Sequence, residues 1–185
     1  MLNDVMVRLI GLHGKSGVGK STVGTILACA GYVNIAFADP LKMACAVMFN
    51  EGLSCWETQA DKAGCPVGFN VPRRKILQSL GTEWGRAEVV NGGISGRPIW
   101  QTLMQQRLLD PNWYKVVITD VRFEDEADLV REHGGVIWHI LRPEQISTDT
   151  HASEQGIFIG ENDVCIINGG NIDTLRNSVM AMLST

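Results

Sequence analysis

Eight residues near the start of the chain constrain its fold more than any other segment. They are Gly14, Lys15, Ser16, Gly17, Val18, Gly19, Lys20 and Ser21, and they fit the pattern G-x-x-x-x-G-K-[ST]. An apolar run at residues 5–12 precedes them, and residues 21–28 have the apolar spacing of a helix. A strand, a glycine-rich turn and a helix in that order bring backbone N–H groups and a helix N-terminus to one point, which favours phosphate binding. The alternative is a glycine-rich turn that binds nothing.

The pattern also predicts the ligand and the role of each polar side chain. Lys20 is expected to contact the β- and γ-phosphates of a nucleoside triphosphate, and the Ser21 hydroxyl to bind Mg²⁺. Thr22 follows directly and joins the eight loop residues as an expected ATP contact. We refer to residues 14–21 as the phosphate loop.

Composition excludes several classes of protein. The 185 residues are 45% apolar, enough for a single domain over 1–185 with a sizeable core. The net charge of −4 without a basic block argues against a nucleic-acid polymer as partner, although a few local arginines suffice for a small phosphorylated substrate. Charged Asp4 and Arg8 argue against a signal peptide or membrane span at the N-terminus. We therefore expect a soluble protein.

The cysteines point to the same environment. They are odd in number and form no C-x-x-C pair, which favours reduced thiols in a cytoplasm, the host's if a phage encodes the chain. Cys55 and Cys65 lie in one loop-rich stretch, but no second ligand pair accompanies them as a metal site would require.

Five apolar runs predict the fold class. Near-continuous apolar character is typical of parallel strands covered on both faces, and helical patterns separate most of the runs. We expect an α/β fold of the P-loop NTPase type, with three α/β/α layers and a five-stranded parallel sheet. The predicted strands are residues 5–12, 33–38, 115–119, 136–141 and 164–167.

The remaining segments divide the expected domain into a core (1–39 and 113–185), a helical substrate-binding insert (40–112) and a short lid-like segment (142–158). Helices are expected in the insert at 40–50, 73–80 and 98–109, with loops at 64–70 and 91–96, and a further helix over 124–133. An insert at the carboxyl ends of parallel strands is a suitable place for a second substrate, and an irregular polar segment suits a lid.

Two carboxylates end predicted strands. Asp39 follows the second strand and Asp120 the third, where carboxylates beside a phosphate loop order the waters of Mg²⁺ or organise arginines. Asp120 is the more typical metal-ordering aspartate because it closes an apolar strand. The alternative for each is a helix N-cap, which Pro40 makes a real competitor at Asp39.

Several arginines are candidates for anion binding. Arg122 lies near the tip of the third strand, and Arg142 begins the lid-like segment. Arg74 and Gln78 share a helix face, suited to a phosphate and a base edge, with a solvated face as the alternative. We expect ordinary surface charges at Arg107, Arg131 and Arg176, and structural roles for His133 and His139.

Beyond the phosphate loop, the chain resembles the bacteriophage deoxynucleoside monophosphate kinases, a branch of the P-loop nucleoside monophosphate kinases. The matching blocks cover most of the chain outside the loops of the insert. They are F-A-D-P-L-K from Phe37, R-K-I-L-Q-S-L-G-T-E from Arg74 with Arg86, T-D-V-R-F from Thr119 through Glu126, L-R-P from Leu141 with T-H-A-S-E from Thr150, and D-V-C-I-I-N from Asp163 with Gly170. The L-Q-x-x-G-T-E and H-x-S-E blocks are specific, because a generic ATPase does not need them. The insert is shorter than in some members, which leaves base selectivity open.

The resemblance implies transfer of the ATP γ-phosphoryl group to a deoxynucleoside 5′-monophosphate. The acceptor's second pKa is about 6, so it is a competent nucleophile without a general base. The implied catalytic residues are Lys20, Arg122, Arg142, Asp39 and Asp120. Ser21 and Asp120 are the implied ligands of Mg²⁺, and Asn168 is implied to lie beside the adenine. The implied acceptor-binding residues are Asp39, Lys42, Arg74, Gln78, Thr82, Arg122, His151 and Glu154.

Two rival functions stay open. A kinase for another small acceptor, similar to a dephospho-coenzyme A kinase, shares the phosphate loop but would need a carboxylate base for its alcohol nucleophile. An ATP-hydrolysing switch or packaging module would need a protein partner instead of a small acceptor. The sequence leaves the accepted bases, the choice of sugar and the oligomeric state open, with a homodimer among the alternatives.

Overall fold

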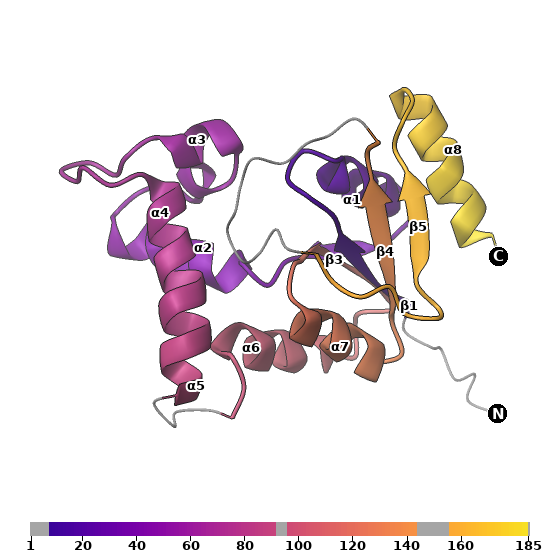
Figure 1. Ribbon diagram of the computed structural model, residues 1–185. Helices are drawn as coiled ribbons and strands as arrows, with labels where there is room; N and C mark the ends of the chain where they lie inside the picture. Colours follow the sequence, from indigo (N-terminus) through magenta and orange to yellow (C-terminus); the bar gives the residue numbers. More distant parts are fainter. Residues whose placement is uncertain (1–7, 92–95, 144–155, 185) are drawn as a thin grey trace. The chain divides into compact units, whose positions relative to one another are not determined.

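The computed structural model describes residues 8–91, 96–143 and 156–184. The chain divides into two compact units, which we describe separately (Figure 1). Unit 1 comprises Met1–Ala36 and Asp110–Thr185, and unit 2 comprises Phe37–Leu109. The functional division into core, insert and lid-like segment stays a prediction.

Unit 1 contains a five-stranded sheet in the order β2-β3-β1-β4-β5, with every neighbouring pair parallel. The predicted α/β class with a five-stranded parallel sheet is confirmed. The connections leave the central strand β1 toward β2 and later cross to β4 on its other side, which makes the carboxyl end of β1 a topological switch point. The strands are β1 (Arg8–His13), β2 (Val33–Ile35), β3 (Lys115–Val121), β4 (Val136–Leu141) and β5 (Val164–Ile167).

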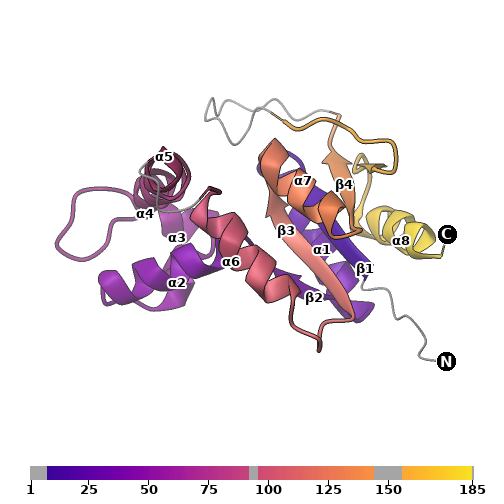
Figure 2. The ribbon, with the colours of Figure 1, turned by 90° about the horizontal axis from the view of Figure 1, so that it is seen from below.

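Helices cover both faces of this sheet, because alternate strand residues are apolar on each side. On one face, Ile10, Val117 and Ile140 form a buried cluster with residues of α1 (Lys20–Cys29) and α8 (Ile172–Leu183). On the other, Gly11 leaves space that Ile137, Val121 and Val130 of α7 (Glu124–Glu132) occupy. Unit 1 therefore has three layers, whose helices can be followed in Figure 2.

Unit 2 is helical. The helix predicted at 40–50 is confirmed to within two residues at each end, and the one predicted at 98–109 to within one. The helix predicted at 73–80 does not end at residue 80, because α4 continues without interruption through η2 and α5. The elements are α2 (Asp39–Met48), η1 (Leu53–Trp56), α3 (Gln59–Ala63), α4 (Arg73–Gln78), η2 (Ser79–Glu88), α5 (Val89–Asn91) and α6 (Ile99–Leu108).

Unit 2 is held at one end by a nearly buried ion pair. The Arg73 guanidinium donates to both carboxylate oxygens of Glu51, at 2.7 and 2.5 Å, and lies 5.8 Å from the ring centre of the fully buried Trp56. This bidentate pair keeps the pKa of Glu51 below its usual value.

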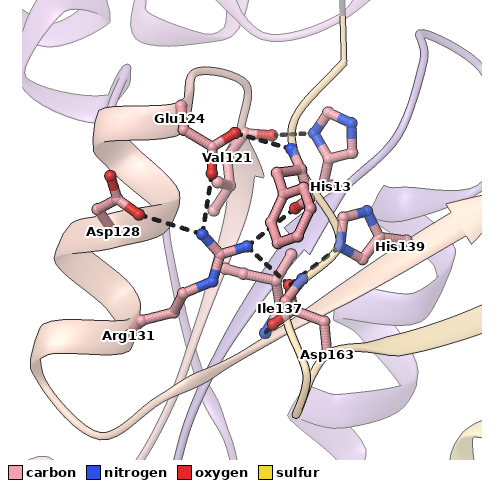
Figure 3. A network of polar contacts seen from close by, with 10 residues as sticks. His13, Val121, Glu124, Asp128, Arg131, Ile137, His139 and Asp163 are labelled. Atoms are coloured by element: carbon pink, nitrogen blue, oxygen red, sulfur yellow. Dashed lines mark hydrogen bonds and ion pairs between the residues drawn. The ribbon is translucent and has the colours of Figure 1, made fainter.

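Unit 1 contains a charge network between α7 and the segment that enters β5 (Figure 3). Arg131 donates to Glu124, Asp128 and the Phe158 carbonyl at 2.9–3.1 Å, and to Asp163 at 2.7 Å. The Asp163 carboxylate is 2% exposed and also accepts from the backbone N–H of Ile137 and Gly160. The prediction of an ordinary surface charge at Arg131 is therefore wrong: it pairs with two carboxylates of its own helix and with Asp163, which is distant in sequence.

Asp163 should make stability depend on pH in the acidic range. Burial alone would raise the pKa of this carboxyl, but the hydrogen bonds from Arg131, Gly160 and Ile137 outweigh burial and lower the pKa to about 2. A lowered folded-state pKa stabilises the fold above the unfolded-state value near 4, and this contribution, about 2 kcal/mol, disappears as the pH falls from about 4 to 2.

We therefore expect Asp163→Asn to lower the free energy of unfolding at pH 7 by about 2 kcal/mol or more. The variant should also lose less stability than the parent protein between pH 4 and pH 2. Urea titrations across that range measure both effects. An equal acid dependence in the two proteins would contradict the assignment.

Candidate active site

The phosphate loop connects the carboxyl end of β1 to the start of α1, as its pattern predicts. Gly19 is the N-cap of α1, and the helix begins at Lys20. The Lys20 ammonium group lies within the loop, where it donates to the carbonyl oxygens of Gly14 and Lys15, the latter at 2.9 Å. Ser21 and Thr22 occupy the first turn of α1, where N–H groups and the helix dipole favour anions.

The carboxyl ends of β4 and β5 support the loop. At Gly14 (φ 146°) a Cβ atom would lie 2.4 Å from the Ile140 carbonyl oxygen, so the end of β4 approaches the loop too closely for a side chain. At Gly19 (φ 110°) a Cβ atom would lie 2.6 Å from the Asn168 side-chain nitrogen. That nitrogen donates to the Val18 carbonyl at 2.8 Å, and the Asn168 backbone N–H donates to Leu141 at 2.7 Å. Asn168 thus joins the loop to β4 and β5.

The tip of β3 carries Asp120 and Arg122. Gly11 of β1 is paired with Ile118 of β3, but His13 is paired with Val121, so β3 contains one extra residue at this point. Such a bulge bends the strand and redirects side chains, and bulges are frequent next to active sites. Asp120 is partly exposed and the Arg122 side chain is exposed.

Helix α7 holds the same tip through Glu126. This carboxylate is 4% exposed and accepts from the backbone N–H of Arg122 at 2.8 Å and of Phe123 at 3.2 Å. The N-cap of α7 is Phe123, so the alternative of Asp120 as the helix cap is wrong. This role of Glu126 is not among the sequence predictions, although a glutamate in the first turn of a helix is a typical capping signal.

In unit 2, Asp39 is the first residue of α2 and is not its N-cap, which is Ala38, so the cap alternative is wrong here too. The Asp39 carboxylate accepts from Arg107 of α6 at 3.1 Å, and both side chains are about one-third exposed. Arg107 is therefore not an ordinary surface charge. One turn along α2, Lys42 pairs with Glu57 at 3.0 Å.

Arg74, Gln78 and Thr82 lie along one continuous helix, the first two in α4 and the third in η2. Arg74 donates a hydrogen bond to the Gln59 side chain of α3. All three residues are partly exposed, as residues that bind a small ligand must be.

The η2 segment is π-helical, a rare conformation that often marks functional sites. Trp100 of α6 packs on it: the indole N–H donates to the Gly81 carbonyl at 2.8 Å, and the ring covers Gly85, where a Cβ atom would lie 2.3 Å away. This contact is not among the sequence predictions, although Gly81 and Gly85 in a helical block are a signal for close packing.

One of the three predicted residues of the lid-like segment lies in the described part of the chain. Arg142 directly follows β4 and is exposed. His151 and Glu154 lie outside the described residues, as does most of the lid-like segment.

The oxygen donors near the phosphate loop fit a magnesium nucleotide. Ser21 and Asp120 both belong to unit 1 and offer a hydroxyl and a carboxylate, the hard ligands that Mg²⁺ prefers. Within the described ranges, no group of three or more His, Cys, Asp or Glu side chains could hold a metal ion. Mg²⁺ fits this arrangement because it usually takes one or two protein ligands together with phosphates and water.

Comparison with known proteins identifies the family. The model of the deoxynucleotide monophosphate kinase family matches residues 69–179. A putative deoxynucleotide monophosphate kinase of Acanthamoeba polyphaga mimivirus is 33% identical over 183 residues, covering 94% of each chain. The chain belongs to the deoxynucleotide monophosphate kinase family. The predicted resemblance is confirmed.

Phage members of this family match over shorter segments. The deoxynucleotide monophosphate kinase of Enterobacteria phage T4 is 31% identical over 109 residues, which are 57% of this chain and 43% of the phage protein. The deoxynucleoside-5′-monophosphate kinase of Escherichia phage T5 is 35% identical over 91 residues, 45% of this chain and 34% of the relative.

Family membership makes the chain a phosphotransferase, with ATP and typically Mg²⁺ implied for its reaction. In the described part of the chain, no helix has the length and apolar character needed to cross a membrane.

We predict that loss of the hydrogen bond from Asn168 to the phosphate loop weakens the binding of Mg·ATP. Asn168→Ala removes the donor to Val18, so the loop loses one neutral hydrogen bond and its affinity for Mg·ATP should fall about 3- to 10-fold. Isothermal titration calorimetry measures this change. Asn177→Ala, at an exposed position on α8, is the control and should bind like the parent protein. An unchanged affinity in Asn168→Ala would show that the bond does not support the loop.

Proposed function

We propose that this kinase transfers the γ-phosphoryl group of ATP to a deoxynucleoside 5′-monophosphate, giving the diphosphate and ADP, with the residues described above. The observation that carries the proposal is the braced phosphate loop with Lys20 at its centre, in a chain of the deoxynucleotide monophosphate kinase family.

The chemistry requires positioning more than proton transfer. An acceptor phosphate with a second pKa near 6 is largely dianionic at neutral pH and attacks without a general base. The site must hold two anions in line and neutralise the charge that spreads over the transferred group. Lysine and arginine side chains with fixed backbones meet this requirement.

For the donor nucleotide, we assign Lys20 to the β- and γ-phosphates and the backbone of the phosphate loop to the remaining phosphate oxygens. Ser21 and Asp120 would hold Mg²⁺, which when bound neutralises the phosphates and orders them for transfer. Asp39 was the other candidate for ordering the metal's waters. Its ion pair with Arg107 supports the role of organising an arginine instead.

For the acceptor, we assign Arg122 and Arg74 to the phosphate and Gln78 with Thr82 to the nucleoside. Guanidinium groups suit a phosphate because they donate two parallel hydrogen bonds, and a carboxamide suits a base edge because it both donates and accepts. Lys42 is assigned a supporting charge, and Arg142, His151 and Glu154 are assigned to closure over the transfer.

The first test is ADP release from Mg·ATP in a coupled assay. The panel comprises all common dNMPs and NMPs, dephospho-coenzyme A and a sample without acceptor. Strong stimulation by one or more dNMPs is expected. Stimulation by dephospho-coenzyme A alone would favour the alternative small-acceptor kinase. ATP hydrolysis that needs no acceptor would favour the ATP-hydrolysing switch. So would the absence of any ADP release until a protein partner is added.

Replacement of Lys20 tests the donor site. Lys20→Ala removes the charge assigned to the transferred phosphoryl group, and kcat should fall about 100- to 1,000-fold, as for loss of a transition-state donor. Far-ultraviolet circular dichroism should be unchanged, because the ammonium donates to carbonyl oxygens of the loop, those of Gly14 and Lys15, which belong to no helix or strand. Lys115→Ala, at the exposed start of β3, is the matched control and should retain activity. Near-normal transfer by Lys20→Ala would overturn the assignment.

A further inference from the structure

His13 lies between the phosphate loop and the tip of β3. The role that we infer for it rests on the proposed function. It is the last residue of β1 and directly precedes Gly14 of the phosphate loop. Its Nδ1 atom lies 3.0 Å from the Val121 carbonyl oxygen at the tip of β3 (Figure 3). A carbonyl oxygen only accepts, so Nδ1 carries the hydrogen and donates it.

This hydrogen bond falls where the sheet is irregular. The extra residue in β3 lies between Ile118 and Val121, opposite the step from Gly11 to His13. A bulge disrupts the regular ladder of backbone hydrogen bonds. Val121 is fully buried, and a buried carbonyl that lost its partner would be costly, so the imidazole supplies a bond at the point where the ladder is broken.

The His13 imidazole also packs against a ring of the neighbouring strand β4. The His139 ring of β4 lies edge-on to the His13 ring, with centroids 5.3 Å apart and planes at 69°. His139 in turn contacts Asp163 at 3.3 Å, within the network that includes Arg131. Figure 3 shows His13 between the Val121 carbonyl and His139. The chain of contacts thus spans β3, β1, β4 and the segment entering β5.

The bulge carries the residues assigned to the reaction. Asp120 lies within it and Arg122 follows it, while Glu126 fixes the backbone N–H of Arg122 from the other side. We propose that His13 is a positioning residue: its hydrogen bond to Val121 holds the β3 bulge in register with the phosphate loop, so that Asp120 and Arg122 stay in place for transfer. A displacement of about 1 Å at such a site can cost on the order of 100-fold in rate.

Two substitutions separate the hydrogen bond from the bulk of the ring. His13→Leu keeps an apolar side chain but has no donor. His13→Asn carries a side-chain amide nitrogen near the position of Nδ1 and restores the donor. For His13→Leu we expect kcat to fall and KM for the dNMP to rise, so that kcat/KM for the dNMP falls about 10- to 100-fold. His13→Asn should recover most of this loss.

His133→Leu is the matched control, because His133 also bonds a backbone carbonyl through Nδ1, that of Leu129 at 2.8 Å, at the far end of α7. It should keep the parent kcat/KM. The proposal is overturned if His13→Leu matches the parent protein, if His13→Asn is as impaired as His13→Leu, or if His133→Leu loses as much.

Amide hydrogen exchange gives a second test that needs no activity. Without any substrate, His13→Leu should exchange faster than the parent protein at residues 119–123, whereas His13→Asn should not. Equal exchange in all three would overturn the proposal even if no acceptor were found. Failure of the proposed function would appear separately, as absence of dNMP-stimulated ADP release in the parent protein.

Discussion

The hydrogen bond from Asn168 to the Val18 carbonyl is the interaction on which the phosphate loop depends most directly. A loop that wraps an anion must turn its N–H groups inward, so its carbonyl groups need partners from elsewhere. Asn168 provides one, and it does so because Gly19 leaves its side chain room. The order of the strands makes this contact possible. β4 lies beside β1 and β5 lies beside β4 on the same side, so residues that follow these two strands in the chain reach the loop.

The tip of β3 follows the same logic with different groups. Its irregular backbone is satisfied by side chains, His13 on one side and Glu126 on the other. Both partners come from elements of unit 1, and both are themselves held in place. Glu126 is buried in α7, and His13 packs against the His139 ring, which in turn contacts Asp163. A site that works by electrostatic preorganisation needs such second contacts, since charged side chains are useful only where their backbones are fixed.

Much of this arrangement could be predicted from the sequence. Apolar runs located all five strands, because strands covered on both faces leave a continuous apolar signal. The phosphate loop was evident because few backbones need two glycines, a lysine and a serine at that spacing. The contacts that hold the site were not predictable. Asn168 and Val18, or Arg131 and Asp163, become neighbours only when the strand order is known, and single-residue properties say nothing about it.

The errors share a physical cause. Arg107 and Arg131 looked like surface charges because an arginine in a polar helix is usually solvated, yet carboxylates distant in sequence recruit both. The end of the helix at residue 80 was misplaced for a related reason. Gly81 and Gly85 lower intrinsic helix propensity, but the Trp100 indole bonds to one and packs on the other, so tertiary packing offsets the local cost. The π-helical backbone of η2 therefore lies within the sequence block that carries Gln78 and Thr82. A regular α-helix would turn the side chains of this block in different directions. Unit 2 thus retains a specific shape through a few close contacts, because glycine allows the Trp100 ring to pack where a larger side chain would keep the two helices apart.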